Sequence, residues 1–261
     1  MLVSVMASFK SSSRGRTQRV YELEHRLDLV PAPAKPGVVE WDGAAVTVEN
    51  VTTAIPAPLG SSAEPQVLSR NVSLCVNEGE SLSVAGENGA GKTSLVRTLA
   101  GLWDPVSGTA RIPPNAFFLP QESYFTKGTL AQQICYPHTR EPDVASARAL
   151  LDKVGLLDDL GDKLGEVRDW ANVLSGGQKQ RMGFARLLCH FERLPAGAPK
   201  FAFLDEPVSA VSKEGVVDLL RVAKRAGVTL ITISHSEVVD NEHPRGVILK
   251  RGGEFETVVR E

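Results

Sequence analysis

The sequence predicts an α/β fold in which a mostly parallel central sheet is joined to an antiparallel β part and a helical part. Residues 201–204 and 228–234 are unbroken apolar runs, which are typical of buried strands in a parallel sheet. Residues 81–85 also have a strand pattern, and a glycine-rich loop follows them. After the loop, Leu95, Val96, Leu99 and Leu102 recur at helical spacing. A strand, a loop and a helix in this order form the βα unit from which such sheets are built.

Length and composition favour a globular chain with room for one large α/β domain or two small ones. The 261 residues can form a sizeable core, and a hydrophobic share of 42% is ordinary for a globular protein. A formal net charge of −2 does not favour nucleic acid as a partner. No apolar run reaches the length of about 18 residues that crosses a membrane, so this chain alone is expected to be soluble. Three cysteines match no metal-binding spacing and are expected to be buried thiols in a reducing compartment: Cys75, Cys135 and Cys189.

Residues 1–36 are expected to form a basic leader, a helix and a proline-rich linker before the main domain, which covers residues 37–261. Apolar residues recur every three or four positions over residues 17–30, which predicts an amphipathic, juxtamembrane-like helix. A disordered leader with accidental periodicity is the alternative. The prolines that follow, Pro31, Pro33 and Pro36, end the helix and stiffen the linker.

The first part of the main domain is predicted to be antiparallel. Alternating patterns predict strands at residues 46–51 and 67–76, with a loop rich in proline, glycine and serine between them. Residues 104–108 have the composition of a turn. Residues 116–119 predict a short buried strand that ends just before Gln121.

A helical part is expected over about residues 122–190, where acidic residues and glycines separate several helical stretches. The polar, proline-containing segment 190–200 is predicted to be a loop. From Val247 onward the sequence predicts a hairpin at the edge of the sheet, with its turn at residues 251–253.

The glycine-rich loop matches the pattern G-x-x-x-x-G-K-[ST] of a phosphate-binding loop. Its glycines allow positive φ, which turns successive N–H groups inward to form a nest for phosphate oxygens. Lys92 adds a positive charge for the β- and γ-phosphates, and the hydroxyl of Thr93 suits Mg²⁺. A chance match in a glycine-rich turn is the alternative, and the strand and helix around the loop argue against it. The loop and the residue after it comprise Gly86, Glu87, Asn88, Gly89, Ala90, Gly91, Lys92, Thr93 and Ser94.

Charged residues at the ends of two predicted strands are candidates for the same site. Asp205 and Glu206 follow one apolar strand and His235 follows the other, and open α/β sheets bind their ligands at such strand ends. Asp205 suits Mg²⁺, and Glu206 suits the orientation and deprotonation of an attacking water. A solvated loop and a structural histidine are the respective alternatives.

The segment Leu174-Ser175-Gly176-Gly177-Gln178 is a second potential anion site. Ser175 is a good N-cap residue, and glycines at the start of a helix leave N–H groups bare. Taken alone, a capped helix with a glycine turn explains this segment equally well.

In their order along the chain, these motifs resemble the nucleotide-binding domain of ABC ATPases, which has a P-loop NTPase fold, over about residues 45–255. The resemblance implies ATP and Mg²⁺ as ligands, with residues 86–93 as the Walker A loop. It also implies that the ABC signature, formed by Ser175, Gly176, Gly177 and Gln178, completes the ATP site on the opposite chain of a head-to-tail pair.

The resemblance assigns a role to each of the remaining candidates. Gln121 is the Q-loop glutamine, a Mg²⁺ ligand that senses the partner domain. Asp205 is the Walker B aspartate and a further Mg²⁺ ligand together with Thr93. Glu206 is the catalytic base, and His235 is the switch histidine that contacts the γ-phosphate.

Finer features resemble subfamily D of the ABC proteins, the peroxisomal fatty-acyl half-transporters. Gly101-Leu102-Trp103 and Leu119-Pro120-Gln121 look like that subfamily, as does Ser209-Ala210-Val211-Ser212. The Walker A loop differs from that of many members because it has Glu87-Asn88. The usual aromatic residue that stacks on adenine is not evident near Ile55.

The resemblance implies that MgATP hydrolysis powers ABC-type transport of fatty acyl or acyl-CoA-like lipids. The implied partners are a second nucleotide-binding domain, in a homo- or heterodimer, and a transmembrane domain in the same full-length protein or in another subunit. The implied location is the cytosolic face of a membrane, and likeness to subfamily D implies the peroxisome. Two alternatives remain open: a soluble ABC ATPase without a transport role, and a regulatory ATP-binding module that does not turn over.

Overall fold

The computed structural model describes residues 37–56, 65–207 and 212–260. The expected helix over residues 17–30, the proline-rich linker and residues 209–211 lie outside the described residues. Within the described ranges, no helix combines the length and the apolar character needed to cross a membrane.

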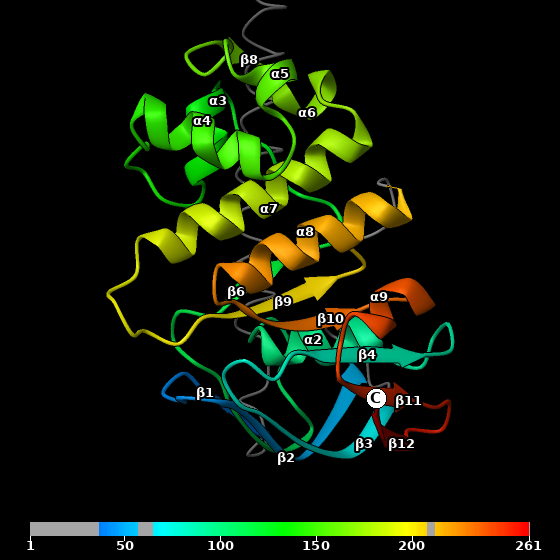
Figure 1. Cartoon of the computed structure of the whole chain (residues 1–261). Helices are drawn as coiled ribbons and strands as arrows, with labels where there is room; N and C mark the ends of the chain where they lie inside the picture. The colour runs from blue at the N-terminus through cyan, green and yellow to red at the C-terminus, as the bar shows by residue number, and fades with distance from the viewer. Residues whose placement is uncertain (1–36, 57–64, 208–211, 261) are drawn as a thin grey trace, which may run out of the picture.

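Two larger β-sheets and a helical part that includes a two-stranded sheet make up the described chain, and Figure 1 shows how they are arranged. The strands are β1 (Val38–Glu40), β2 (Val46–Ile55), β3 (Gln66–Val76), β4 (Leu82–Gly86), β5 (Ser107–Arg111), β6 (Phe117–Leu119), β7 (Gly128–Thr129), β8 (Val167–Arg168), β9 (Phe201–Asp205), β10 (Thr229–Ile233), β11 (Arg245–Leu249) and β12 (Phe255–Val259). The helices are α2 (Lys92–Leu99), α3 (Leu130–Cys135), α4 (Val144–Lys153), α5 (Leu157–Leu160), α6 (Trp170–Val173), α7 (Gly176–Glu192), α8 (Lys213–Arg225) and α9 (Glu237–Asn241).

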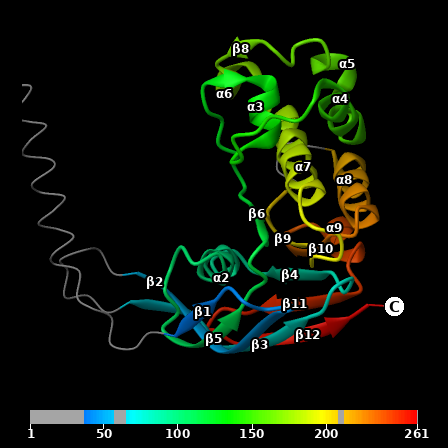
Figure 2. The same cartoon turned by 90° about the vertical axis from the view of Figure 1, so that its left-hand side faces the viewer.

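The larger sheet is the mostly parallel sheet that the sequence predicts. Its described strands run in the order β12-β11-β4-β10-β9-β6, and all are parallel to their neighbours except β12. Figure 2 shows α7 and α8 above this sheet and α2 on its other side, between it and β2. Phe201 and Phe203 of β9 pack toward α2, whereas Ala202 and Leu204 pack toward α7 and α8. Because both faces are covered, the strand needs an unbroken apolar run.

The prediction of an edge hairpin at the end of the chain is only half right. The hairpin exists, and β12 lies at the edge of the sheet. However, β11 lies inside the sheet because it also pairs in parallel with β4, where Leu249 is opposite Gly86. This second pairing brings the turn of the hairpin next to the glycine-rich loop.

The smaller sheet has the order β1-β5-β2-β3, with β2 antiparallel to both of its neighbours. Strands predicted at residues 46–51 and 67–76 are confirmed, and the first continues to Ile55. The expectation of a turn at residues 104–108 is partly wrong, because β5 already begins at Ser107. Ala110 alone is buried among its residues, so its sequence has no clear alternation.

The helical part contains helices α3 to α7 and one small pairing of β7 with β8. Ser175 caps α7 as predicted: its hydroxyl accepts from the backbone N of Gln178, whose side chain accepts from the backbone N of Ser175. The loop predicted from residue 190 starts too early, because α7 continues to Glu192. The reason is Phe191, which is 2% exposed and extends the buried face of the helix.

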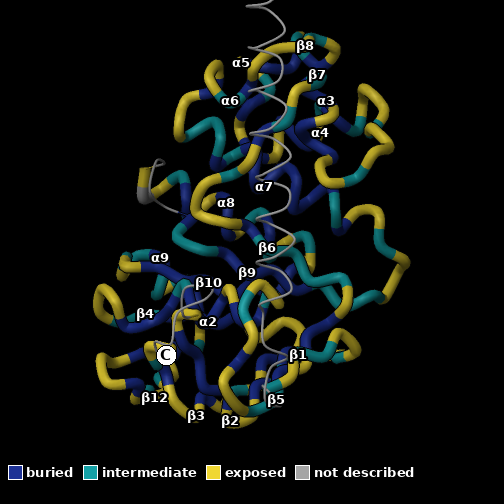
Figure 3. The backbone as a smooth tube through the Cα atoms, turned by 180° about the vertical axis from the view of Figure 1, so that it is seen from behind, coloured by how far each residue is buried: buried dark blue, intermediate teal, exposed yellow. Residues whose placement is uncertain are grey.

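Two further expectations about burial are wrong. Leu102 was expected to continue the apolar face of α2, but the helix ends at Leu99 and Leu102 is 71% exposed. Cys75 was expected to be buried and is exposed, because Val72 and Val76 are the residues that β3 turns toward the core. Figure 3 shows the overall pattern, in which β9 and β10 lie buried between more exposed outer segments.

Candidate functional site

The glycine-rich loop joins β4 to α2 and is packed closely on two sides. Gly91 is the N-cap of α2 with φ +95°, and a Cβ at this position would lie 2.9 Å from the Cβ of Leu68. A Cβ at Gly86 would lie 2.2 Å from the carbonyl oxygen of Leu249. The conformation of the loop therefore depends on glycine at both positions.

The side chain of Lys92 lies back across the inside of this loop. Its Nζ donates hydrogen bonds of 2.9 Å to the carbonyl oxygens of Gly86 and Glu87. Burial lowers the pKa of Lys92, and the negative charges of Glu206 and Asp205 partly oppose this effect. The ammonium group is thus held in the concave side of the loop, where phosphate oxygens would add strong acceptors.

Thr93 and Asp205 form an oxygen pair beside the loop. The hydroxyl of Thr93 donates to Oδ1 of Asp205 at 3.2 Å. Burial raises the pKa of Asp205, and Glu206 adds to the increase, while Thr93, Arg97 and Lys92 oppose it. A half-buried carboxylate next to a hydroxyl fits Mg²⁺, which prefers oxygen ligands and is usually held by one or two carboxylates together with substrate phosphates.

Glu206 follows β9 in an unusual backbone conformation and is held by two other candidates. Its φ is +46°, and its backbone N donates to the carbonyl oxygen of Ile233 at 3.0 Å. Gln121 donates from Nε2 to Oε2 of Glu206 at 3.0 Å, and Nε2 of His235 lies 3.3 Å from Oε1. A left-handed conformation is costly for a residue other than glycine, and such outliers are concentrated at functional sites.

One pocket of about 390 Å³ brings the loop together with Glu206 and His235. The predicted residues among its lining are Asn88, Gly89, Gly91, Lys92, Thr93, Ser94, Glu206 and His235. Ile55 of β2 and Gln66 and Leu68 of β3 complete the lining and were not predicted. Between Trp41 and Trp103 the sequence has no aromatic residue, so neither strand brings a ring to this pocket.

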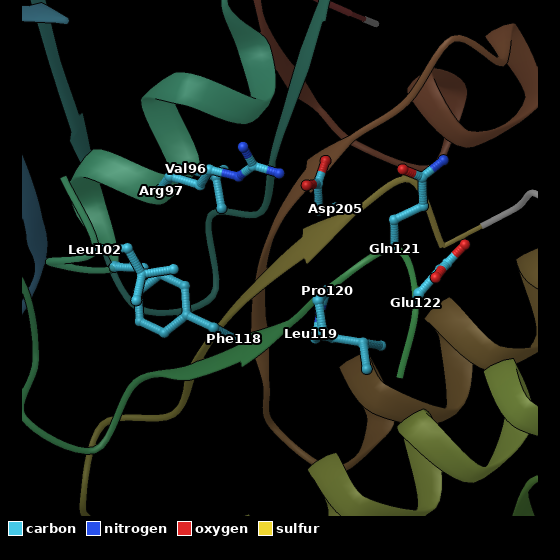
Figure 4. A pocket seen from close by; sticks show the side chains of 10 residues that line it. Val96, Arg97, Leu102, Phe118, Leu119, Pro120, Gln121, Glu122 and Asp205 are labelled. Carbon is cyan, nitrogen blue, oxygen red and sulfur yellow. The ribbon is translucent and has the colours of Figure 1, made fainter. Parts of the chain in front are cut away.

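A second cavity of about 340 Å³ lies on the other side of Asp205, and Figure 4 shows it from close by. Asp205 lies between Arg97 and Gln121 in this view. Leu102 and Phe118 form its apolar end. The lining of this cavity thus includes Gln121 and Asp205, two of the predicted residues that do not line the phosphate-loop pocket.

The structure does not bring the signature segment to this pocket. Ser175, Gly176, Gly177 and Gln178 begin α7 in the helical part (Figure 1), and none of the described residues that line the pocket comes from them. Gln178 instead donates from Nε2 to Asp159 at 3.0 Å. The role of the segment on an opposite chain therefore stays a prediction.

A central parallel sheet whose first βα turn is a phosphate loop defines the class of P-loop nucleotide-binding domains. Comparison with known proteins gives the family. The family model described as ABC transporter matches residues 69–209, and the chain belongs to this family. ATP-binding domains of ABC transporters are ATPases, so the chain is an ABC-type ATP hydrolase.

The most similar relatives include members of subfamily D. The protein named ATP-binding cassette sub-family D member 1 from Drosophila melanogaster is 39% identical over 185 residues, which are 66% of this chain and 24% of that protein. The human lysosomal cobalamin transporter ABCD4 is 36% identical over 251 residues, which are 90% of this chain and 39% of that protein. The chain thus spans well under half the length of these relatives, and its domain is most like those of subfamily D.

A solved structure of a bacterial Atm1-family ABC exporter with ATP bound has the same fold. Its TM-score is 0.69 at 20% identity, and the match covers 94% of this chain and 44% of the exporter chain. Together with the family, this likeness confirms the predicted fold class, an ABC-type P-loop NTPase with mixed sheets.

Proposed function

We propose that residues 37–261 form a nucleotide-binding domain, with a helical subdomain at about residues 122–190, that hydrolyses MgATP to power ABC-type transport. One observation carries the proposal. Side chains from four separate segments meet beside the phosphate loop: Gln121 and His235 both contact Glu206, and Asp205 accepts a hydrogen bond from Thr93 of the loop. Lys92, the neighbour of Thr93, lies in the same pocket as Glu206 and His235.

The chemistry that these residues support is placement and charge stabilisation. Lys92 and the N–H groups of the loop bind the β- and γ-phosphates, while Thr93 and Asp205 hold the magnesium ion. A bound magnesium ion neutralises phosphate charge. Glu206 orients the attacking water and accepts its proton, and His235 contacts the γ-phosphate. Phosphoryl transfer is accelerated mainly by such preorganised electrostatics.

The contacts of Glu206 define a resting arrangement of this site. Gln121 and His235 both bind its carboxylate, so the carboxylate that would accept a proton from water is already hydrogen-bonded. If His235 turned to a bound γ-phosphate and Gln121 to a bound magnesium ion, both would leave the carboxylate of Glu206, which could then contact water. The base would thus be available only with nucleotide in place.

Pairing with a second domain supplies the remaining part of the proposal. Ser175, Gly176, Gly177 and Gln178 present the N-terminus of α7, a helix of 17 residues, which favours anionic ligands. In a head-to-tail pair this end would face the triphosphate of the opposite chain. ATP then holds two domains together and hydrolysis releases them, which is a ligand-driven population shift.

The cargo that we propose is a fatty acyl or acyl-CoA-like lipid, carried by a transmembrane partner at the cytosolic face of the peroxisome. Likeness to subfamily D supports this proposal. The printed name of one relative, a lysosomal cobalamin transporter, makes cobalamin in the lysosome the competing cargo. ATPase activity in vesicles that contain the protein with its transmembrane domain decides between them: stimulation by palmitoyl-CoA supports the proposal, and stimulation by cobalamin alone contradicts it.

The ATPase role is tested by binding and turnover in the purified 261-residue chain. Lys92→Ala should abolish the binding of a fluorescent ATP analogue, because the site loses the buried charge inside its loop. Glu206→Gln should keep nucleotide binding but nearly stop phosphate release in a malachite-green assay. Glu78→Gln, an exposed carboxylate outside the site, is the matched control. Unchanged turnover of Glu206→Gln would remove it as the base, and a wild-type chain that binds but never turns over would favour the regulatory module.

A further inference from the structure

The turn of the β11–β12 hairpin contacts the outside of the phosphate loop. Arg251, in this turn, donates from Nε and Nη2 to the carbonyl oxygen of Asn88 at 3.3 and 3.1 Å. Its Nε also lies 3.3 Å from Oε2 of Glu87. A residue 163 positions away in the chain therefore contacts two consecutive residues of the loop, Glu87 and Asn88.

The hairpin itself is anchored well enough to act as a support. Strand β11 pairs with β4 directly before the loop, and the carbonyl oxygen of Gly253 accepts from the backbone N of Arg70 at 2.9 Å. Lys250 and Glu256 form an ion pair of 2.7 Å across the two strands. Arg251 therefore extends from a turn that is fixed to the sheet on one side and to β3 on the other.

The loop is held by cations on both of its sides. Lys92 binds the carbonyl oxygens of Gly86 and Glu87 from inside, and Arg251 binds the carbonyl oxygen of Asn88 from outside. When Lys92 turns its ammonium group toward a triphosphate, the inner support of the loop weakens. The outer support by Arg251 remains, and the N–H groups of the loop stay directed at the phosphates.

The carboxylate of Glu87 gives Arg251 a second task. A negative charge on the phosphate loop repels the triphosphate, and a guanidinium group at 3.3 Å offsets that charge. Both side chains are about 70% exposed, so the ion pair by itself is expected to contribute little. The hydrogen bonds to the carbonyl oxygen of Asn88 are therefore the main contribution, because they fix the backbone of the loop.

We propose that Arg251 is a positioning residue for nucleotide binding, which keeps the phosphate loop in its binding conformation through the carbonyl oxygen of Asn88. This inference rests on the proposed ATPase function. A preformed loop does not have to be ordered when the ligand binds, and this lowers the dissociation constant. Arg251 does not touch the reacting atoms, so its loss should change affinity and not the chemical step.

The test measures the dissociation constant of mant-ATP with Mg²⁺ for the complete chain and its variants. Arg251→Ala should raise this constant by about 3- to 10-fold, which is the size of effect expected from the net contribution of about one hydrogen bond. In the phosphate assay, KM for ATP should rise in the same ratio while kcat stays unchanged. Arg251→Lys should recover part of the affinity, because lysine keeps one donor but not the planar fork.

Three further variants separate the carbonyl contact from alternatives. Glu87→Gln removes the ion pair but keeps the bonds to Asn88, so its affinity should equal or exceed that of the wild type. The exchanged pair Glu87→Arg with Arg251→Glu restores an ion pair without a donor to Asn88, so it should bind as weakly as Arg251→Ala. Lys153→Ala breaks an exposed ion pair with Glu192 in the helical part and should leave mant-ATP binding unchanged.

Each result bears on the inference in one direction. Faster amide hydrogen exchange of residues 86–91 in Arg251→Ala, with a wild-type unfolding midpoint, supports it. Wild-type affinity of Arg251→Ala, or full rescue by the exchanged pair, overturns it and leaves the ATPase function intact. Absence of mant-ATP binding by the wild-type chain overturns the proposed function itself.

Discussion

The close packing around Gly91 leads to a prediction whose size can be worked out from the structure. In Gly91→Ala, the φ of +95° costs a residue with a side chain about 1–2 kcal/mol. The new Cβ would lie 2.9 Å from the Cβ of Leu68, and such overpacking costs about 1–3 kcal/mol more. We therefore expect a total cost of about 2–5 kcal/mol, shared between the free energy of unfolding and the affinity for nucleotide.

Urea unfolding and mant-ATP titration of the same samples measure the two parts of this cost. A loss of affinity converts to free energy at about 1.4 kcal/mol for each tenfold change. Gly227→Ala is the matched control, because Gly227 has φ +79° but a Cβ there would meet nothing within 4 Å. It should cost about 1–2 kcal/mol of stability and no affinity. If the summed loss of stability and affinity in Gly91→Ala is no larger than in Gly227→Ala, the close packing of the loop against β3 would be contradicted.

Other consequences of the site can be checked by simpler measurements. Burial raises the pKa of Asp205, so its negative charge is unfavourable in the folded chain. Asp205→Asn should therefore unfold at an equal or higher temperature than the wild type without ligand, but it should lose the stabilisation by ATP with Mg²⁺. A lower unfolding midpoint without ligand would contradict this. Ile55→Tyr adds a ring to the pocket wall and should lower the dissociation constant of mant-ATP by about 2- to 12-fold, the equivalent of about 0.5–1.5 kcal/mol for ring stacking. Burial lowers the pKa of His243 to about 4, against about 6.5 in the unfolded chain, so the unfolded state binds more protons between these values. The contribution of His243 to the free energy of unfolding should therefore be complete above pH 6.5, and the free energy should fall by about 3 kcal/mol as the pH drops to 4. Most of this pH dependence should be missing in His243→Gln.

The parts of the site that were predictable from sequence are those in which a local pattern and its chemistry coincide. The loop pattern around Lys92 requires a strand before it and a helix after it, and the structure has both. The apolar run before Asp205 and Glu206 is typical of a strand covered on both faces, and the structure has such a strand with these carboxylates at its end. His235 follows from the same reasoning for the adjacent strand.

The parts that were missed depend on contacts between segments far apart in the sequence. Ile55 and Leu68 reach the pocket because the β2–β3 hairpin folds over the phosphate loop, and nothing in their own neighbourhood indicates a ligand. Arg251 was predicted only as part of a turn, because its contact with Asn88 depends on the pairing of β11 with β4. Leu102 was assigned to a helix by spacing alone, although Gly101 with φ +68° already ends the regular turn there.

The account depends on the convergence of these separate segments on one triphosphate, and a structure of the Glu206→Gln chain with MgATP tests this most directly. We expect the β- and γ-phosphates inside the glycine-rich loop, with the γ-phosphate within hydrogen-bond distance of Lys92 and His235 and the magnesium ion bound by Thr93. A triphosphate bound elsewhere, or in the loop but out of reach of His235 and Asp205, would contradict the account.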